Sequence, residues 1–511
     1  MKKPTLVLAI IVAIVVIVAA AAYVKFISPH AVSAKVVAAD NRDYFPIVHN
    51  LLAGAQRSIE VIIYQGRFYF QYPLSSSNTL IADLADASQR GVKVRAVIDE
   101  ADWNPENSEE NHDVSTVLSQ AGIATYFDPL ETTSHSKMVV VDGRYSVVGS
   151  MNWNYYALDR NNEATTIVDS PVIGKQFEAY FDNLVKACST AYRLPDHYLT
   201  ASEAVGAKSR TVFVKDLADS GKYLPDARAG LLYMGNVVVR ADSDALNEIL
   251  ALDSLFFAGA AKETVRVFAE VEKGGGRELH ALDLETDATK SEMARALGIE
   301  RSKLKTTSVP TPSFAWTSAS RVEPIPNDKY QPAVSKLFQS AKKRIWIAVM
   351  DARFYDTRPV PPSRDKRKGK GGPPSVTNLM LDDLEQAVGR GVDVQLICDN
   401  GRGGSQPNNK LAFMKKLHDA GGKVFWDSPD ITTHAKVAIV DDDWVVVGSA
   451  NWTEPGMEEN NETSILVESP ELNQHYATYI TSIKGQEADL RPIGAGGGGQ
   501  AGGGGGGGGG D

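Results

Sequence analysis

The residues best suited to chemistry occur twice in this 511-residue chain, in the same order and at the same spacing. Each copy follows the pattern H-x-K-x4-D-x6-G-S-x-N. The members are His135, Lys137, Asp142, Gly149, Ser150 and Asn152 in the first copy, and His434, Lys436, Asp441, Gly448, Ser449 and Asn451 in the second. An imidazole titrates near neutral pH, and ammonium, hydroxyl and carboxamide groups donate hydrogen bonds. Each copy therefore has the groups needed to bind an anionic oxygen ligand such as phosphate.

The two copies belong to a longer internal repeat. Four sequence blocks recur 286 to 300 residues further along the chain: 55–69 with 341–355, 90–99 with 390–399, 135–153 with 434–452, and 161–165 with 460–464. A lone histidine or lysine is more often structural or solvated than catalytic. The duplication favours function, because the same chemical groups recur while the residues between them differ.

The elements that position these residues show an α/β pattern in each unit of about 150 residues. Each unit has a β-rich run, an amphipathic helical stretch, a second strand, another helical stretch and a third strand. In the first unit the two β-rich runs are 59–64 and 92–98, and in the second they are 345–350 and 392–398. Strands that alternate with helices predict an α/β fold with a mainly parallel sheet.

A predicted β-hairpin follows in each unit and contains the residues of the H-x-K-x4-D-x6-G-S-x-N motif. The spacing of two between His135 and Lys137 predicts that both lie on one face of a strand. The Asp142-Gly143 pair predicts a turn, and the returning strand then places the Gly-Ser-x-Asn segment beside the histidine. At Gly149 we expect the backbone to approach a ligand closely.

This duplicated pattern resembles the phospholipase D superfamily, and the Asn-Asn-Glu segments at 161–163 and 460–462 match it too. The resemblance covers residues 40–190 and 328–485. It implies two repeats packed with pseudo-twofold symmetry, so that both motifs meet in one cleft. It also implies that one histidine attacks phosphorus to form a phosphohistidine, while the other protonates the leaving oxygen and then activates water or an alcohol.

The resemblance also implies roles for the other motif residues. Phosphate oxygens would be held by Lys137, Lys436, Asn152 and Asn451, with help from the hydroxyls of Ser150 and Ser449. Glu163 and Glu462 would each accept a hydrogen bond from a histidine ring and so fix its tautomer. Asp142, Asp441, Gly149 and Gly448 are predicted to be structural members of the motif. The scheme needs no metal and no cofactor, and the other seven histidines are scattered singly rather than at ligand spacing.

Three functional hypotheses remain open at this point. The first is a membrane-anchored phosphodiesterase that hydrolyses phospholipid or exchanges its headgroup, the second is a nuclease with the same mechanism, and the third is a non-catalytic phosphate-binding membrane scaffold. The continuations Trp153-Asn154 and Trp452-Thr453 differ from the pattern of cardiolipin synthase-like members and look more like the hydrolase and nuclease branches. A basic segment at 358–372 would suit either an anionic membrane or single-stranded nucleic acid.

Composition and the segments outside the repeats narrow these hypotheses. The net charge of −10 disfavours a chain built to grip nucleic acid, and two cysteines exclude a disulfide scaffold. Residues 1–27 contain an apolar run from Leu6 to Val24, which predicts a retained signal anchor and an extracytoplasmic catalytic region, with a cleaved signal peptide as the alternative. Residues 200–326 have no twin and are predicted to form a small inserted α/β domain. The Gly-rich tail at 494–511 is predicted to be disordered. The sequence sets no oligomeric state.

Overall fold

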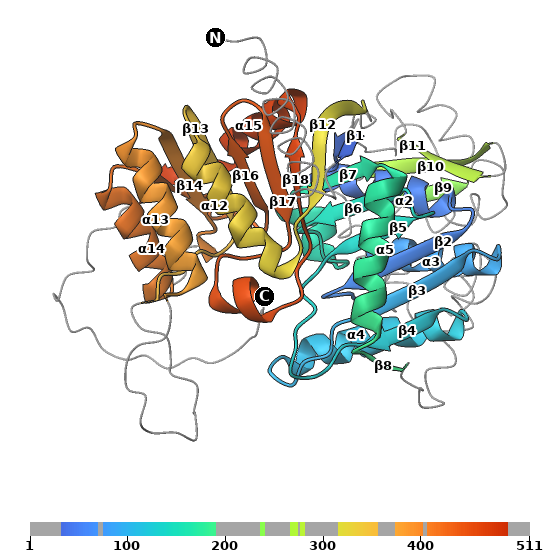
Figure 1. Cartoon of the computed structure of the whole chain (residues 1–511). Coiled ribbons are helices and arrows are strands. Elements are labelled where there is room, and N and C mark those ends of the chain that lie inside the picture. Colours follow the sequence, from blue (N-terminus) through green and yellow to red (C-terminus); the bar gives the residue numbers. More distant parts are fainter. Residues whose placement is uncertain are drawn as a thin grey trace, which may run out of the picture.

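The fold is built on one continuous sheet that runs through both repeats (Figure 1). This computed structural model describes residues 32–69, 75–190, 236–240, 266–273, 276–281, 315–355, 374–401 and 406–488. The order of the sheet's 16 strands is β19-β15-β14-β13-β16-β17-β18-β12-β1-β7-β6-β5-β2-β3-β4-β8. The two halves of this order mirror each other about the contact between β12 and β1. The structure therefore has the pseudo-twofold arrangement of two α/β repeats.

Each half of the sheet combines parallel and antiparallel strands. The first repeat contains β2 (Ser58–Ile63), β3 (Lys93–Ile98), β4 (Ala124–Phe127), β5 (Met138–Val141), β6 (Tyr145–Gly149) and β7 (Thr165–Asp169). The first three pair in parallel and the others pair antiparallel. The prediction of a mainly parallel sheet is therefore wrong for the hairpin half, where the connection between β5 and β6 is too short for a parallel crossover.

The second repeat reproduces this pattern. Its strands are β13 (Arg344–Val349), β14 (Asp393–Cys398), β15 (Lys423–Asp427), β16 (Lys436–Val440), β17 (Trp444–Gly448) and β18 (Ser464–Glu468). Their pairings match those of the first repeat strand for strand. The short strands β8 (Ser189–Thr190) and β19 (Lys484–Glu487) lie at the outer edges.

Two strands join the repeats at the centre. Strand β1 (Val32–Ala38) pairs with β7 on one side and with β12 (Thr317–Pro324) on the other, and β12 pairs in turn with β18. The predicted inserted domain included residues 317–324, and the structure corrects this boundary. The apolar alternation of β12 buries Ala319 and Val322 in the central core, which is why this strand belongs to the main sheet.

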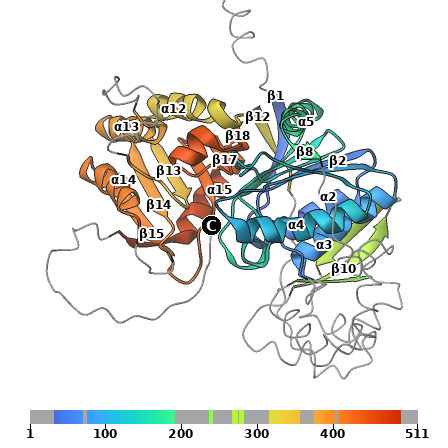
Figure 2. The same cartoon turned by 90° about the horizontal axis from the view of Figure 1, so that it is seen from below.

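Helices cover both faces of the sheet (Figure 2). The outer helices are α2 (Tyr44–Ala53), α3 (Ser76–Gln89) and α4 (Pro105–Gln120) in the first repeat, and α12 (Tyr330–Ser340), α13 (Val376–Gly389) and α14 (Asn408–Asp419) in the second. They enclose one hydrophobic core in each repeat. On the opposite face, α5 (Pro171–Val185) and α15 (Pro470–Ile483) share a third core with strands from both halves.

The shared core fixes how the repeats sit against each other. Phe177 and Phe181 of α5 and Tyr476 of α15 are fully buried in it. The Tyr476 hydroxyl donates to the carbonyl oxygen of Thr165 across the repeat boundary, at 2.9 Å. Both helices begin at a Ser-Pro pair, where the serine side chain accepts from the third helical N–H and proline occupies the first turn. The two helices that pack between the repeats therefore both begin with a serine cap.

Short elements complete the described fold. The 3-10 helices η1 (Asn41–Asp43) and η5 (Asn327–Lys329) precede α2 and α12, and the π-helical turns η2 (Tyr156–Arg160) and η7 (Pro455–Glu459) follow the motifs. Within the inserted segment, β9 (Asn236–Arg240), β10 (Arg266–Lys273) and β11 (Gly276–Ala281) form a separate three-stranded sheet.

Several predicted features lie outside the described residues. These are the apolar segment at 6–24, the basic segment at 358–372, the tail at 494–511 and most of the inserted domain. Within the part of the chain that the structure describes, no helix is both long and apolar enough to span a bilayer.

Candidate functional site

The two motifs meet because each histidine is bonded to a glutamate of the other repeat. Nδ1 of His135 lies 2.8 Å from Oε1 of Glu462, and Nδ1 of His434 lies 2.9 Å from Oε2 of Glu163. All four side chains are buried. A carboxylate can only accept, so each ring donates its Nδ1–H and keeps the lone pair on Nε2 for chemistry. The sequence predicted the His–Glu contacts and did not predict that they cross between repeats.

The electrostatics keep these pairs as neutral imidazole and charged carboxylate. Burial lowers the pKa of His135 to about 4, an effect that Glu462 opposes and Lys137 reinforces. Burial likewise lowers the pKa of His434. Burial alone would raise the pKa of Glu163 and Glu462, but their histidine, lysine and serine neighbours outweigh it and hold both below the ordinary value. Near neutral pH both Nε2 atoms are therefore unprotonated in the unliganded site.

The motif serines hold the glutamates rather than a ligand. The Ser150 hydroxyl donates to Glu163 Oε2 and accepts from the Ala164 N–H, and Ser449 repeats both contacts with Glu462 and Thr463. Both serines are fully buried. The prediction that Ser150 and Ser449 bind phosphate is therefore wrong, because donor and acceptor are already used behind the site.

Each motif lysine bonds to the backbone of the histidine two residues before it. Nζ of Lys137 donates to the carbonyl oxygen of His135 and Nζ of Lys436 to that of His434, each at 2.6 Å. Burial and the nearby charge of Lys436 lower the pKa of Lys137 well below its ordinary value. An anion bound between the two ammonium groups would relieve this repulsion and restore the charge on Lys137.

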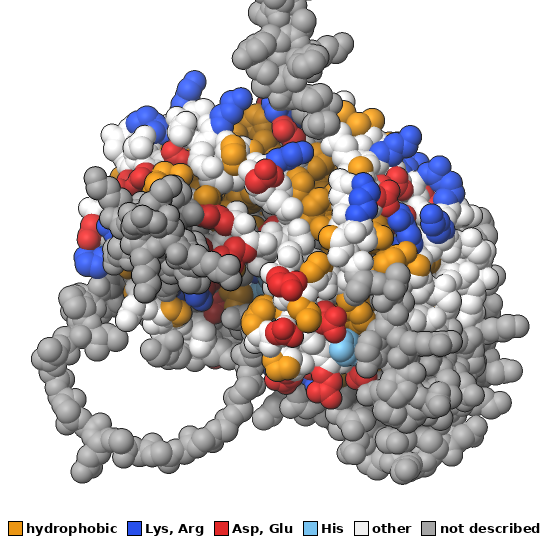
Figure 3. All heavy atoms as spheres, turned by 60° about the horizontal axis from the view of Figure 1, so that its bottom comes forward, with side chains coloured by type: hydrophobic (Ala, Val, Ile, Leu, Met, Phe, Trp, Pro, Cys, Tyr) orange, Lys and Arg blue, Asp and Glu red, His pale blue; other side chains and the backbone are white. Residues whose placement is uncertain are grey.

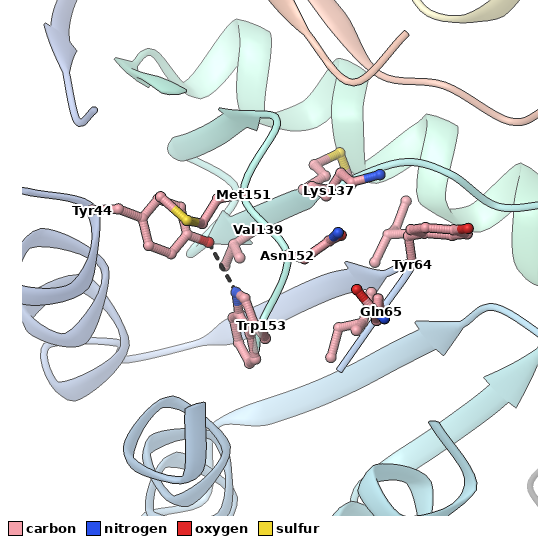
Figure 4. A pocket seen from close by; sticks show the side chains of 11 residues that line it. Tyr44, Tyr64, Gln65, Lys137, Val139, Met151, Asn152 and Trp153 are labelled. Carbon is pink, nitrogen blue, oxygen red and sulfur yellow. Dashed lines mark hydrogen bonds between the residues drawn. The ribbon is translucent and has the colours of Figure 1, made fainter. Parts of the chain in front are cut away.

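A pocket beside Lys137 contains the motif asparagine (Figure 4). Tyr64, Gln65 and Asn152 line it, and Figure 4 shows the Asn152 amide between Lys137 and Gln65. Among the described residues, no hydrogen-bond partner exists for Oδ1 of either Asn152 or Asn451, although both atoms are buried. Buried polar atoms normally have partners, so these amides are available to a ligand.

The Asn-Asn-Glu segments also reach across the repeat boundary. The carbonyl oxygen of Asn162 accepts from the backbone N–H groups of His434 and Ala435. On the other side, the Ser136 hydroxyl donates to the carbonyl oxygen of Asn461, and the Asn461 N–H donates to the carbonyl oxygen of Thr133. Each segment thus supplies a glutamate and also holds the chain next to the opposite histidine.

The motif glycines and aspartates have structural roles. A Cβ on Gly149 would lie 2.4 Å from the carbonyl oxygen of Ala164, and one on Gly448 would lie 2.6 Å from that of Thr463. Close packing of adjacent strands requires these glycines, which gives them a structural role. Asp142 adopts φ 56° in the hairpin turn, and its carboxylate accepts from the backbone N–H groups of Arg57 and Ser58. Asp441 makes the equivalent contacts in the second repeat.

Sequence reasoning missed further residues at the site. The Tyr64 ring packs edge-on against His135, with 4.5 Å between ring centroids, and Nζ of Lys137 lies 4.3 Å from the Tyr64 centroid. Behind each histidine, two aspartates converge on one backbone N–H: Asp99 with Asp128, and Asp399 with Asp427. The repeat itself contained a signal, because Asp99 and Asp399 end matching blocks.

The comparisons with known proteins agree with this geometry. A family model described as "Cardiolipin synthase, PLD-like domain" matches residues 48–185 and 334–484, which together are more than half of the chain. The chain belongs to the phospholipase D superfamily. Both matches coincide with the two structural repeats, and both contain a complete motif.

Curated relatives in the superfamily match a single stretch of the chain. A mitochondrial cardiolipin hydrolase of Xenopus laevis is 33% identical over 133 residues, which are 26% of this chain and 57% of that protein. A phospholipase D of Rickettsia prowazekii is 28% identical over 115 residues, 22% of this chain and 52% of the relative. The chain thus spans about half the length of the curated relatives that it matches.

Among solved structures, the phosphatidylserine synthase of Haemophilus influenzae aligns with 88% of this chain and 87% of its own, at 12% identity and a TM-score of 0.48. Nuc, a phospholipase D family member from Salmonella typhimurium, aligns with 33% of this chain and 97% of its own, at 21% identity and a TM-score of 0.27.

The described site contains no metal-binding cluster. No group of three or more His, Cys, Asp or Glu side chains within the described ranges is arranged to hold a metal ion. The histidines can act as acids, bases or nucleophiles, and the lysines and asparagines can donate hydrogen bonds to an anion.

Proposed function

We propose that this chain is a membrane-anchored phosphodiesterase that cleaves phospholipid through a covalent phosphohistidine. The observation that carries the proposal is the pair of buried histidines, each bonded through Nδ1 to a glutamate of the opposite repeat. This arrangement frees two Nε2 atoms in a shared site with Lys137 and Lys436. A nucleophile and a general acid are the two groups that cleavage of a phosphodiester by substitution requires.

The reaction divides into two balanced steps. In the first, Nε2 of one histidine forms a bond to phosphorus while the bond from phosphorus to the leaving oxygen breaks. The second histidine gives its Nε2 proton to that oxygen. In the second step this histidine takes a proton from water, the water oxygen bonds to phosphorus, and the N–P bond breaks. Lys137, Lys436, Asn152 and Asn451 hold the non-bridging oxygens as charge develops.

We assign the nucleophile to His135 on one difference between the repeats. Tyr64 packs on His135, and the equivalent position in the second repeat is Met350. Burial lowers the pKa of both histidines, so each ring is neutral before substrate binds. His434 is then the general acid. The negative charge of bound phosphodiester, together with Glu163, favours its protonated form.

Substitution of each histidine separates the two steps. With bis(p-nitrophenyl) phosphate, whose leaving group needs no proton, His434→Ala is expected to form the phosphoenzyme and then stall. His135→Ala is expected to release no nitrophenol and form no adduct. Steady-state turnover should fall at least about 100-fold in either variant, the scale of general acid–base catalysis. Mass spectrometry of alkali-quenched protein measures the adduct.

An adduct on His434 in the His135→Ala variant would reverse the assignment of roles. Near wild-type turnover in either variant would contradict the shared site.

Phospholipid is the substrate class that the molecule supports best. The curated relatives include proteins named cardiolipin hydrolase and phospholipase D. On the face shown in Figure 3, acidic and hydrophobic side chains occupy the centre of the described surface, and Lys and Arg gather toward its upper edge. The described part of this face therefore has no continuous basic path of the kind that nucleic acid needs.

A competition assay tests the substrate class. The full-length protein in detergent, with EDTA present, is offered mixed phospholipid vesicles and single-stranded DNA side by side. We expect headgroup release and intact DNA, because the proposed chemistry needs no metal. DNA cleavage without lipid turnover would select the nuclease alternative. Phosphate binding without turnover of either substrate would select the non-catalytic scaffold.

The apolar run from Leu6 to Val24 supports a membrane anchor. Its 19 residues suffice to cross most of a hydrocarbon core of about 30 Å at about 1.5 Å per residue. We expect the full chain to stay in the membrane pellet after alkaline carbonate extraction, and a variant lacking residues 2–27 to be released. Protease added outside right-side-out vesicles should digest the catalytic region. Protection from that protease would place the region in the cytoplasm instead.

A further inference from the structure

Two buried carboxyl groups converge on the backbone just before His135. Oδ1 of Asp99, just after β3, lies 2.8 Å from the backbone nitrogen of Ser134, and Oδ2 of Asp128, after β4, lies 2.7 Å from it. Because both accept from one nitrogen, the two carboxyl groups lie next to each other. Both side chains are almost completely buried. The donors to this pair, the N–H groups of Ser134 and Glu100 and the amide of Asn107, are all neutral, so two buried negative charges here would repel each other.

The second repeat has the same arrangement before His434. Asp399, after β14, and Asp427, at the end of β15, both accept from the backbone N–H of Thr433, at 3.0 and 2.9 Å. Each pair therefore ties two neighbouring strand ends to the residue that immediately precedes a catalytic histidine. This duplication is independent of the H-x-K motif, because the four aspartates lie outside it.

The pairs differ in one neighbouring side chain. In the second repeat, the buried Lys410 of α14 donates from Nζ to the carbonyl oxygen of Asp399, at 2.7 Å. At the equivalent position of α4 in the first repeat, the neutral Asn111 donates to the carbonyl oxygen of Asp99, at 2.8 Å. A buried lysine thus donates to the backbone of the second pair, and a neutral amide takes its place beside the first.

We propose that Asp99 and Asp128 share one proton and act as a positioning clamp for His135, whereas Asp399 and Asp427 clamp His434 with Lys410 beside them. The four residues act through the loops before the histidines and do not touch the substrate. Only the kinetic test of this proposal depends on the proposed function, because the unfolding test needs no activity.

The surroundings of the first pair favour retention of the proton. From α4, Nδ2 of Asn107 lies 3.5 Å from Oδ2 of Asp99, and the backbone N–H of Glu100 donates to Asp128. The charge of Lys137 opposes retention of the proton and favours the ionised form of Asp99. The Cys188 thiol is also close, and the charge of Asp128 adds to burial in raising the pKa of that thiol. Burial first and the charge of Asp128 second raise the pKa of Asp99 to about 8.

The sign of the pH effect follows from this shift. The folded protein holds a proton that an unfolded aspartate, with a pKa of about 3.9, would release. Rising pH between about 4 and about 8 therefore favours the unfolded state, by up to tenfold in the unfolding constant per pH unit. Above about pH 8 the pair loses its proton, and repulsion between the carboxylates loosens the loop before His135.

Urea unfolding of the full-length protein in detergent, measured from pH 4.5 to 8.5, tests the shared proton without any activity assay. Asp99→Asn supplies a permanent N–H donor to Asp128, so the ratio of wild-type to variant unfolding constants should rise by up to tenfold per pH unit. A ratio that does not change with pH overturns the shared proton. The reciprocal variant Lys410→Asn copies Asn111, and it should make unfolding more pH-dependent than in the wild type.

Kinetics with a small soluble phosphodiester test the positioning role. Asp99→Ala removes one arm of the clamp and should lower kcat at least tenfold with little change in KM. Asp99→Asn should recover most of that loss and should lack the decline in kcat that we expect of the wild type near pH 8. Wild-type kcat in Asp99→Ala overturns the clamp, as does an unchanged pH profile in Asp99→Asn. Lack of turnover by the wild-type protein would refute the proposed function and leave the unfolding test intact.

Discussion

The hydrogen bond between each histidine and a glutamate of the opposite repeat is the constraint on which the rest of the structure depends. Neither repeat contains a complete site, because His135 needs Glu462 and His434 needs Glu163. The continuous sheet through β1 and β12 and the core shared by α5 and α15 keep these contacts in register. A small rotation between the repeats would break both contacts together. The pseudo-twofold packing of the repeats is therefore what brings each histidine to its glutamate.

Charge balance explains why so polar a centre can be buried. Removal of an ionised group from water costs several kcal/mol unless it is paired and hydrogen-bonded. The two glutamates each accept from a histidine and a serine, while the two lysines donate to backbone carbonyls beside the histidines. The site without ligand thus sets two carboxylates against two lysines, of which Lys137 has a pKa well below its ordinary value. A bound anion would favour the charged form of Lys137.

The parts of this structure that could be predicted from the sequence are those that occur in both copies of the internal repeat. The two units, the hairpin with its Asp-Gly turn, and the motif residues at the site all follow from matching blocks. The direction of the Glu163 contact did not follow, because a repeat shows which residues are equivalent and not which copy they contact. The hydroxyl of Ser150 points behind the site because it caps Glu163, and only packing decides that. Strand β12 was missed because its pairing partners, β1 and β18, are far from it in sequence.

The crossing of the two contacts can be measured directly by NMR of ¹⁵N-histidine-labelled protein. We predict two downfield Nδ1–H resonances, one lost in His135→Ala and the other in His434→Ala. Glu462→Gln replaces a charged acceptor by a neutral one, so it should move the His135 resonance strongly and leave that of His434 nearly in place. Glu163→Gln should do the reverse. If Glu462→Gln moved the His434 resonance instead, each repeat would hold its own histidine, and the crossed His–Glu arrangement would be contradicted.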